Sequence, residues 1–415
     1  MPERDLRGWL RVLGPGLAVA ATGVGAGDVV AAAVAGSRFG IAVAWAAIIG
    51  AVFKFVLNEG IARWQLSTGT TLLEGWATRL GRPVQIVFLA YLILWGFFVG
   101  GALMSACGLA AHAIAPALSV RSWGALHSIV FAALVLVGGY GPFERFVKIL
   151  IAAMFVALIG CAAVVQPPLL TLQQIIGEAG IPTGSARLLL GVVGGVGGTV
   201  TMLSYGYWIR EKGWRGREWY RVARVDLAVA YGLTGLFGLA VMVLAAVVLH
   251  AEGVVVEGSS GVIRMGTMLG AVAGPIGEWA FRLGFWAAVA TSMVGVWQGV
   301  PYLFADFVAQ RKGDGTIVDT RSRPYRGFLL WLCLPPMLLL WFERPVQIIL
   351  LYSILGAVFM PFLAGTLLYM NRKIEWVGAE MRSGWLSSAL LTLALVLFGA
   401  LGWFSIAKAL ASLAR

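Results

Sequence analysis

A single carboxylate, Asp28, stands inside a long apolar stretch near the N-terminus. Three closely spaced glycines precede it, namely Gly23, Gly25 and Gly27. Glycine weakens a helix by up to about 1 kcal/mol per residue relative to alanine, so this cluster favours an unwound segment. Hydrocarbon does not tolerate exposed carbonyls and amides unless they line a cavity or bind something. A carboxylate beside such carbonyls makes an all-oxygen site, which suits hard cations such as Mg²⁺.

A second glycine cluster covers residues 194–198 in another apolar stretch and is followed by Thr201 and Met202. The thioether of Met202 would favour ions that are softer than Mg²⁺, such as Mn²⁺ or Fe²⁺, and ordinary packing is its alternative role. The alternative for Asp28 is capping of the following half-helix through backbone amides. The predicted substrate-binding residues are Gly25, Asp28, Gly198, Thr201, Met202, Tyr205 and Gln298. The predicted helix breaks are at Gly23, Gly25, Gly27, Gly195, Gly197 and Gly198.

The composition indicates which elements must position these residues. Of the 415 residues, 60% are hydrophobic and 12% are charged, which is about half the charge of a soluble domain. Apolar runs of about 18 to 28 residues recur along the chain, and each can cross a hydrocarbon core as a helix. The runs do not alternate, so a strand barrel is excluded. We therefore predict an all-α, polytopic helical membrane protein with eleven spans: 13–36, 40–62, 84–111, 122–140, 144–166, 186–208, 223–249, 276–307, 326–342, 345–370 and 384–410.

The basic residues predict the orientation of the chain. Twenty-two of the 31 Lys and Arg residues fall in one alternating set of loops, including the N-terminal segment. The positive-inside rule places this set in the cytoplasm, with the C-terminus outside. The net charge of +12 is then explained by the orientation of the chain in the membrane and does not indicate nucleic-acid binding. A bacterial inner membrane is the simplest location. Within span 2, Lys54, Asn58, Glu59 and Arg63 lie at helical spacing, which allows either a gate network or a local ion pair.

The two glycine clusters lie in spans 1 and 6, which are five spans apart in the chain. This matching placement implies a duplication. Residues 13–166 and 186–370 would form two five-helix repeats, and 384–410 would be an added helix. Because five is odd, the second repeat must be inverted in the membrane, as in LeuT-like transporters. Their substrate site lies at the midplane, between discontinuous helices.

Several motifs resemble the Nramp (natural-resistance-associated macrophage protein) divalent-metal transporters. They are Leu13-Gly14-Pro15-Gly16, Gly25-Ala26-Gly27-Asp28, Gly36-Ser37-Arg38-Phe39-Gly40, Thr68-Gly69-Thr70-Thr71-Leu72-Leu73-Glu74, Gly198-Thr199-Val200 and Met360-Pro361-Phe362. The resemblance covers almost the whole chain. It implies a secondary carrier that moves a divalent metal ion by alternating access, with the ion between the two breaks.

The chain departs from the family at the site itself. Gly25 stands where the family has its metal-binding aspartate, and Asp28 stands where it has asparagine. Thr201 replaces the soft methionine, and Leu203 replaces the histidine. Span 3 has no acidic residue, where the family keeps carboxylates for proton movement. We therefore expect a hard divalent ion such as Mg²⁺ or Mn²⁺, transported without proton coupling.

Other classes have less support in the sequence. No phosphate-binding loop and no Ser/His/Asp arrangement is visible, so we expect no enzyme, no permanently bound cofactor and no nucleic-acid partner. Membrane lipid and the transported ion or solute are the expected partners; the oligomeric state stays open, with a monomer plausible. Two alternatives remain: the same fold could carry a monovalent cation or a small organic molecule, or the chain could be a non-transporting membrane sensor.

Overall fold

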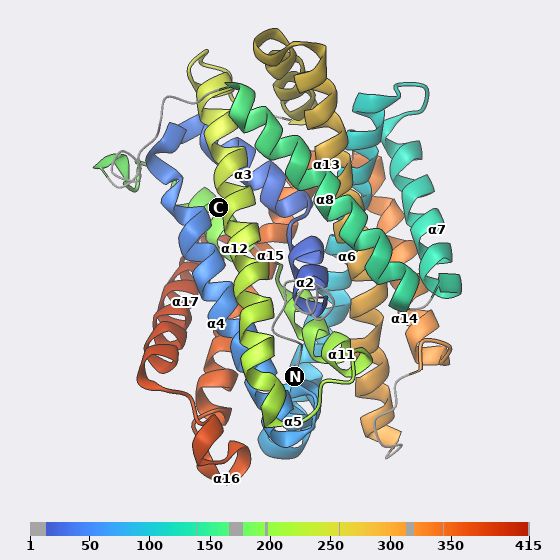
Figure 1. Ribbon diagram of the computed structural model, residues 1–415, viewed down its shortest axis with the longest axis vertical. Helices are drawn as coiled ribbons and strands as arrows, with labels where there is room; N and C mark the ends of the chain where they lie inside the picture. Colours follow the sequence, from blue (N-terminus) through green and yellow to red (C-terminus); the bar gives the residue numbers. More distant parts are fainter. Residues whose placement is uncertain are drawn as a thin grey trace.

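The regular elements of the protein are helices, in agreement with the all-α prediction (Figure 1). The computed structural model describes residues 14–138, 140–165, 177–195, 198–256, 258–312, 319–342 and 344–413. Within those ranges there is no β-strand. Fifty-five glycines and long apolar runs therefore produce a bundle of close-packed helices, as expected for a membrane protein.

The first half of the chain begins with a broken span. Helices α2 and α3 are bent by 50° relative to one another at the first glycine cluster. The elements of this half are α2 (Pro15–Gly23), α3 (Ala26–Phe39), η1 (Gly40–Val43), α4 (Trp45–Thr68), α5 (Leu72–Gly75), η2 (Trp76–Leu80), α6 (Arg82–Ile114), α7 (Val120–Gly138) and α8 (Tyr140–Val165).

The second half also begins with a broken span, at the second glycine cluster. Its elements up to the long central helix are α10 (Ala186–Gly195), η3 (Val200–Leu203), α11 (Ser204–Glu211), η4 (Arg217–Trp219), α12 (Tyr220–Ala245), η5 (Ala246–His250) and α13 (Gly258–Lys312). They are followed by α14 (Arg323–Cys333), η6 (Pro335–Phe342), α15 (Pro345–Met370), α16 (Ile374–Val377), η7 (Ala379–Met381) and α17 (Trp385–Leu413).

The helices coincide with the eleven expected spans. Among the described residues, seven helical segments are long and apolar enough to cross a membrane, and the bent pair of α2 and α3 makes an eighth. The other three expected spans coincide with α8, with α17, and with α10 to α11 across the second break. The chain is a multi-pass membrane protein.

Two boundaries differ from the prediction for a clear physical reason. The expected span 326–342 is not one α-helix, because Pro335 and Pro336 lack the N–H groups that would continue α14, and a 3-10 helix follows. The helix that contains the expected span 276–307 begins earlier, at Gly258, and is kinked at Gly274 (φ 68°), directly before Pro275.

The core is formed around α13, which packs against α8, α6, α14 and α2. Helix α12 packs against α4 and α3, and α15 packs against α17, α6 and α10. Small residues allow close approach: a Cβ added to Gly108 of α6 would lie 2.1 Å from the carbonyl oxygen of Val120 in α7. The two parts of the first broken span, α2 and α3, both pack against α12 and α13.

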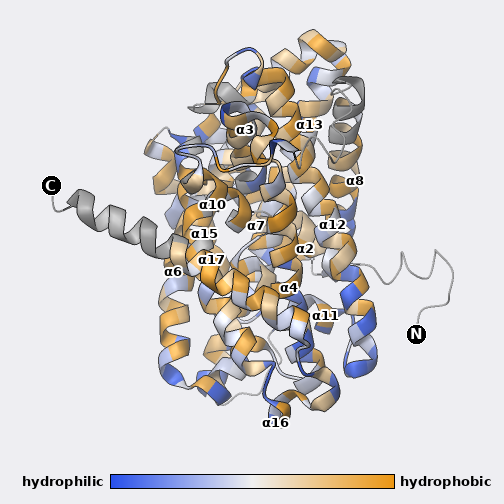
Figure 2. Cartoon of the chain, turned by 90° about the vertical axis from the view of Figure 1, so that its left-hand side faces the viewer, coloured by the Kyte–Doolittle hydropathy of each residue, from blue (hydrophilic) through white to orange (hydrophobic). Residues whose placement is uncertain are grey.

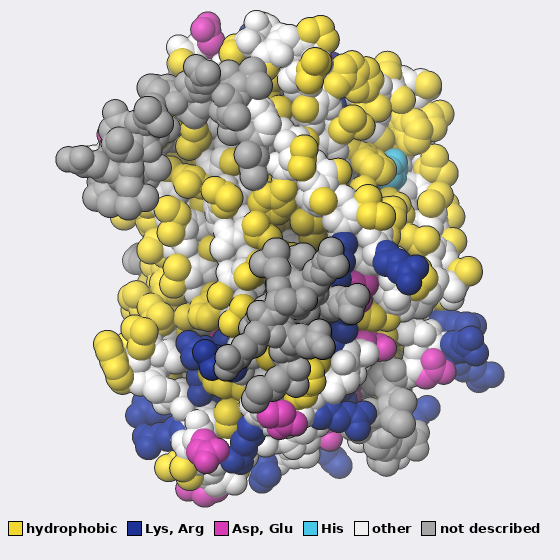
Figure 3. Space-filling view, viewed as in Figure 1, with side chains coloured by type: hydrophobic (Ala, Val, Ile, Leu, Met, Phe, Trp, Pro, Cys, Tyr) yellow, Lys and Arg dark blue, Asp and Glu magenta, His cyan; other side chains and the backbone are white. Residues whose placement is uncertain are grey.

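The surface is apolar over most of its height and basic at one end. Figure 2 shows hydrophobic residues along the helices, with hydrophilic residues concentrated at the ends of the molecule. In Figure 3, Lys and Arg side chains gather at the lower end, where Figure 1 places α5 and α16. This distribution matches an apolar belt in lipid and one strongly basic face.

Candidate functional site

The two broken spans meet, as the glycine clusters predict. Gly198 has a positive φ of 86°, which a residue with a side chain rarely adopts. A Cβ on Gly198 would lie 2.5 Å from the Thr201 hydroxyl oxygen and 3.3 Å from the Cα of Gly23. On the other side of the first break, a Cβ on Gly25 would lie 2.2 Å from the Ser292 hydroxyl oxygen. Both breaks are therefore places where backbone approaches its neighbours without room for a side chain.

Asp28 caps the second half of the first broken span. It is buried in the first turn of α3, and one of its carboxylate oxygens accepts a hydrogen bond from the Gly25 N–H at 3.1 Å. The capping role considered for Asp28 is therefore present. The cap also limits the break, because α3 begins at Ala26 and Gly27 lies inside its first turn. The break at Gly27 was wrongly predicted, and unwinding is confined to Val24 and Gly25.

Lys54 of α4 enters the second break, which its sequence neighbours did not indicate. Its side chain is fully buried. The ammonium group donates a hydrogen bond to the carbonyl oxygen of Gly194 at 2.7 Å and another to the carbonyl oxygen of Gly198. The negative charge of Asp28 acts on it. We call Asp28, Lys54 and the carbonyl oxygens of Gly194 and Gly198 the central site.

The other polar residues of span 2 form their contacts away from the second break. Glu59 and Arg63 form the local ion pair at 2.5 Å that helical spacing allows. Asn58 donates a hydrogen bond to the Tyr231 hydroxyl of α12 at 2.9 Å. The four polar residues of span 2 are therefore not one network, and only Lys54 contacts the second break.

The remaining predicted residues divide into two groups. Thr201 and Met202 are buried in η3, directly after the second break. The side chains of Tyr205 and Gln298 form hydrogen bonds with residues outside the central site. The Tyr205 hydroxyl donates to Asp226 at 3.1 Å, and the Gln298 side chain accepts from the Trp208 ring N–H at 2.7 Å.

Of the other residues expected at the breaks, Gly23 ends α2 and Gly195 ends α10. Gly197 lies outside the described residues. The first break therefore begins after Gly23, as expected, and α10 ends within the second glycine cluster.

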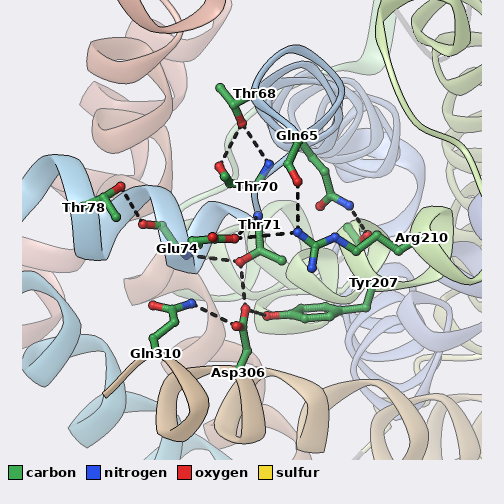
Figure 4. Close-up of polar contacts among 12 residues, drawn as sticks. Gln65, Thr68, Thr70, Thr71, Glu74, Thr78, Tyr207, Arg210, Asp306 and Gln310 are labelled. Carbon is green, nitrogen blue, oxygen red and sulfur yellow. Dashed lines mark hydrogen bonds and ion pairs between the residues drawn. The ribbon is translucent and has the colours of Figure 1, made fainter. Parts of the chain in front are cut away.

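A second polar cluster, drawn in Figure 4, lies beside α5 and α11, which Figure 1 places in the lower part of the molecule. Asp306 of α13 is fully buried and accepts hydrogen bonds from the Thr71 hydroxyl at 2.7 Å and from the Tyr207 hydroxyl. The Gln310 amide donates to its other oxygen at 3.0 Å. These contacts join the segment before α5 to α11 and α13. We call Thr71, Glu74, Tyr207, Arg210, Asp306 and Gln310 the Asp306 cluster.

Glu74 and Arg210 form the outer part of the Asp306 cluster. Their charged groups are 3.7 Å apart, and Arg210 also donates to the Gly69 carbonyl oxygen at 3.1 Å. Partial burial raises the pKa of Glu74 above its usual 4.5; the charge of Asp306 adds to the rise, and Thr71 and Arg210 oppose it. The cluster is thus a closed network of charges and hydroxyl groups between the two halves of the chain.

Comparison with known proteins identifies the family. The model of natural resistance-associated macrophage protein-like chains, Nramp, matches residues 16–407. The chain belongs to the Nramp family. A curated relative, the "Divalent metal cation transporter MntH" of Deinococcus radiodurans, is 23% identical over 322 residues, covering 71% of this chain and 69% of the relative.

Solved structures confirm the Nramp and LeuT-like fold. A crystal structure of a point mutant of the Eremococcus coleocola manganese transporter superposes with a TM-score of 0.74 at 16% identity, covering 98% of this chain and 89% of that one. MhsT in complex with L-phenylalanine superposes with a TM-score of 0.57 at 17% identity, covering 92% and 98%.

Asp28 is not the only acidic side chain that is buried in this Nramp chain. Asp226 of α12 is 1% exposed and Asp306 is fully buried. Both stand near the ends of their expected spans, where a sequence places them at the membrane surface. Asp226 is instead enclosed by the Gly16 N–H, which donates to it at 2.6 Å, and by Tyr205. Tertiary contacts supply the donors that make burial tolerable.

The central site is rich in backbone oxygen and poor in the usual metal-binding side chains. Among the described residues, no group of three or more His, Cys, Asp or Glu side chains could hold a metal ion. Its oxygen atoms are those of the Asp28 carboxylate and the carbonyls of Gly194 and Gly198, and the Thr201 hydroxyl lies beside Gly198. Such donors suit a hard cation that keeps part of its water.

Proposed function

We propose that this Nramp-family chain is a secondary transporter that carries a divalent metal cation by alternating access. The observation that carries the proposal is that the two broken spans meet. At this place the carbonyl oxygens of Gly194 and Gly198 accept hydrogen bonds from the Lys54 ammonium, and the charge of Asp28 acts on that ammonium. Discontinuous helices provide backbone dipoles and unpaired carbonyls at the midplane, where a transporter binds its substrate. Relatives named as divalent metal and manganese transporters support this substrate class.

The donor set favours a hard ion such as Mg²⁺ or Mn²⁺. Asp28, Thr201 and the carbonyl oxygens of the second break would provide oxygen ligands, and Gly25 would allow close backbone approach. Met202 follows Thr201 directly and is fully buried, so it packs at the edge of this region. Helix α6 carries no acidic residue, which supports transport without proton coupling.

The Asp306 cluster is proposed as the gate on the cytoplasmic side. It ties Thr71 of the first half to Tyr207 and Asp306 of the second half. It lies beside α5 and α11, toward the end where Lys and Arg side chains gather (Figures 1 and 3). The positive-inside rule assigns a basic face to the cytoplasm, which supports a cytoplasmic N-terminus. Movement between the inverted repeats 13–166 and 186–370 would break these bonds and open a path from the central site.

Uptake into proteoliposomes tests the proposal. The purified chain should accumulate Mn²⁺ or Mg²⁺, and Asp28→Asn should reduce uptake by about tenfold or more, since it removes the charge of an oxygen ligand. Asp319→Asn is the control, because Asp319 is exposed in a loop. Full uptake by the Asp28→Asn protein would exclude Asp28 from the substrate site.

One observation favours a second candidate function, transport of a different solute. The Lys54 ammonium already contacts the carbonyl oxygens that a metal ion would use. A small organic solute could bind beside this charge without displacing it. Uptake of an organic solute in the absence of added metal ions would separate this function from the first.

A further inference from the structure

We propose that the Lys54 ammonium is a tethered cation of the central site, which competes with the transported cation for the carbonyl oxygens of Gly194 and Gly198. The inference rests on the proposed function, because it names the residue that sets cation affinity at the same site.

The first argument is the need of a buried ammonium for partners. Lys54 has no exposed surface, although it stands in the middle of α4. An ammonium group has three N–H donors, and burial without acceptors would be very costly. Two of its acceptors are backbone carbonyls of the second break, one of them 2.7 Å away. The position of the ammonium group is therefore specified by the break itself.

The second argument is the state of those carbonyls. Helix α10 ends at Gly195, so the Gly194 carbonyl belongs to the last turn, where carbonyls lack an intrahelical N–H partner. The C-terminal end of a helix also carries partial negative charge, which favours a cation. Gly198 lies outside the helix with a positive φ, and its carbonyl accepts from the same ammonium group. Both oxygens are ligands that an alkali or alkaline-earth cation would use.

The third argument is the charge of the surroundings. Asp28 acts on Lys54 from α3, and it also acts on the hydroxyls of Tyr231 in α12 and Tyr352 in α15. Among the described residues, Asp28 is the carboxylate whose charge acts on the Lys54 ammonium. A divalent cation that entered while the ammonium group stayed would meet a positive charge at close range. The incoming cation must therefore displace the Lys54 side chain, and Lys54 lowers the affinity of the site.

The experiment measures cation binding to the full-length purified protein by calorimetry and thermal shift, with Mn²⁺, Mg²⁺ and Na⁺ as probes. Lys54→Met keeps the length of the side chain and removes its charge. We expect it to bind a probe cation roughly tenfold or more tightly than the native chain, because a unit positive charge no longer opposes binding. We also expect a lower melting temperature without cation, which the probe restores, because the two carbonyls would otherwise stay buried without partners.

Two further variants complete the design. Lys148→Met removes a partly exposed lysine that pairs with Glu144 at 2.8 Å, and it should leave cation affinity unchanged. Lys54→Gln provides a second uncharged side chain if the methionine variant does not fold; its amide can still donate to a carbonyl, so it should show the gain in affinity with a smaller loss of stability.

The outcomes separate this inference from the proposed function. Native affinity that depends on Asp28 but is unchanged in both Lys54 variants would overturn the inference and leave the proposed function standing. Failure of every probe to bind the Lys54 variants would also overturn it. A cation that binds only after Lys54 is replaced would support the inference and contradict divalent-metal transport by the native chain.

Discussion

The Thr71 hydroxyl donates a hydrogen bond of 2.7 Å to the carboxylate of Asp306, although the two residues are 235 positions apart. Thr71 is also the N-cap of α5, where its hydroxyl accepts from the Glu74 N–H at 3.1 Å. One side chain therefore caps a short helix of the first half and ties that helix to α13 of the second half. This hydrogen bond would break if the two halves separated at the basic end of the molecule, as the proposed gate requires.

Replacement of Asp306 should loosen that end. Asp306→Ala removes the acceptor of Thr71, Tyr207 and Gln310, at a cost of about 1–3 kcal/mol for the buried donors left behind. We expect faster hydrogen–deuterium exchange across residues 69–75, measured by mass spectrometry, together with altered uptake. Asp319→Ala in an exposed loop is the control, and unchanged exchange at 69–75 would mean that the cluster is not a gate.

Removal of one partner of the buried Glu59–Arg63 pair should strongly destabilise the protein. The side chains are 5% and 9% exposed, and Arg63 also donates to the Met381 carbonyl at 2.8 Å. Glu59→Gln leaves the buried guanidinium without its counter-charge, so we expect a loss of about 3–5 kcal/mol in the free energy of unfolding, measured by detergent titration. Glu380→Gln should cost less than about 1 kcal/mol, because its pair with Arg217 is exposed. Equal losses of stability in the Glu59→Gln and Glu380→Gln proteins would contradict this prediction.

Glu74 should make stability depend on pH. Its pKa is raised in the folded protein above the usual 4.5, chiefly by burial, so the folded state binds more protons than the unfolded state in that range. The contribution of Glu74 to stability should therefore be fully present below pH 4.5 and be lost as the pH rises through the folded pKa. Glu74→Gln should flatten this part of the curve of melting temperature against pH.

Glu375→Gln is the control for Glu74, because Glu375 is exposed in α16. An unchanged pH profile in the Glu74→Gln protein would show that other groups cause the dependence.

The second break should not accept a side chain. Gly198→Ala must adopt a positive φ and also place a Cβ 2.5 Å from the Thr201 hydroxyl oxygen. We expect a loss of about 1–3 kcal/mol and strongly reduced uptake. Gly213→Ala is the matched control, because Gly213 also has a positive φ, of 72°, but nothing lies within 4 Å of the added Cβ. If both variants lose equal stability and keep uptake, backbone strain alone explains the effect.

The helices and their breaks follow from patterns that are local in the chain. A run of about 20 apolar residues forms a membrane helix wherever it occurs, and adjacent glycines weaken it at that point. For this reason the all-α class, the position of each span and the breaks near Gly25 and Gly198 could be predicted. Pro335 and Pro336 are also a local pattern, and they end the α-helical part of the expected span 326–342.

Tertiary structure alone decided which distant groups the buried polar side chains contact. The helical spacing of Lys54 predicts contacts within span 2, yet its acceptors Gly194 and Gly198 are 140 and 144 positions away. Asp226 and Asp306 stand near span ends and look interfacial, but packing of α12 and α13 against other helices buries them. Hydropathy and glycine content act over one or two helical turns, whereas an ammonium or carboxylate is stabilised by whichever distant backbone and hydroxyl groups the fold brings to it.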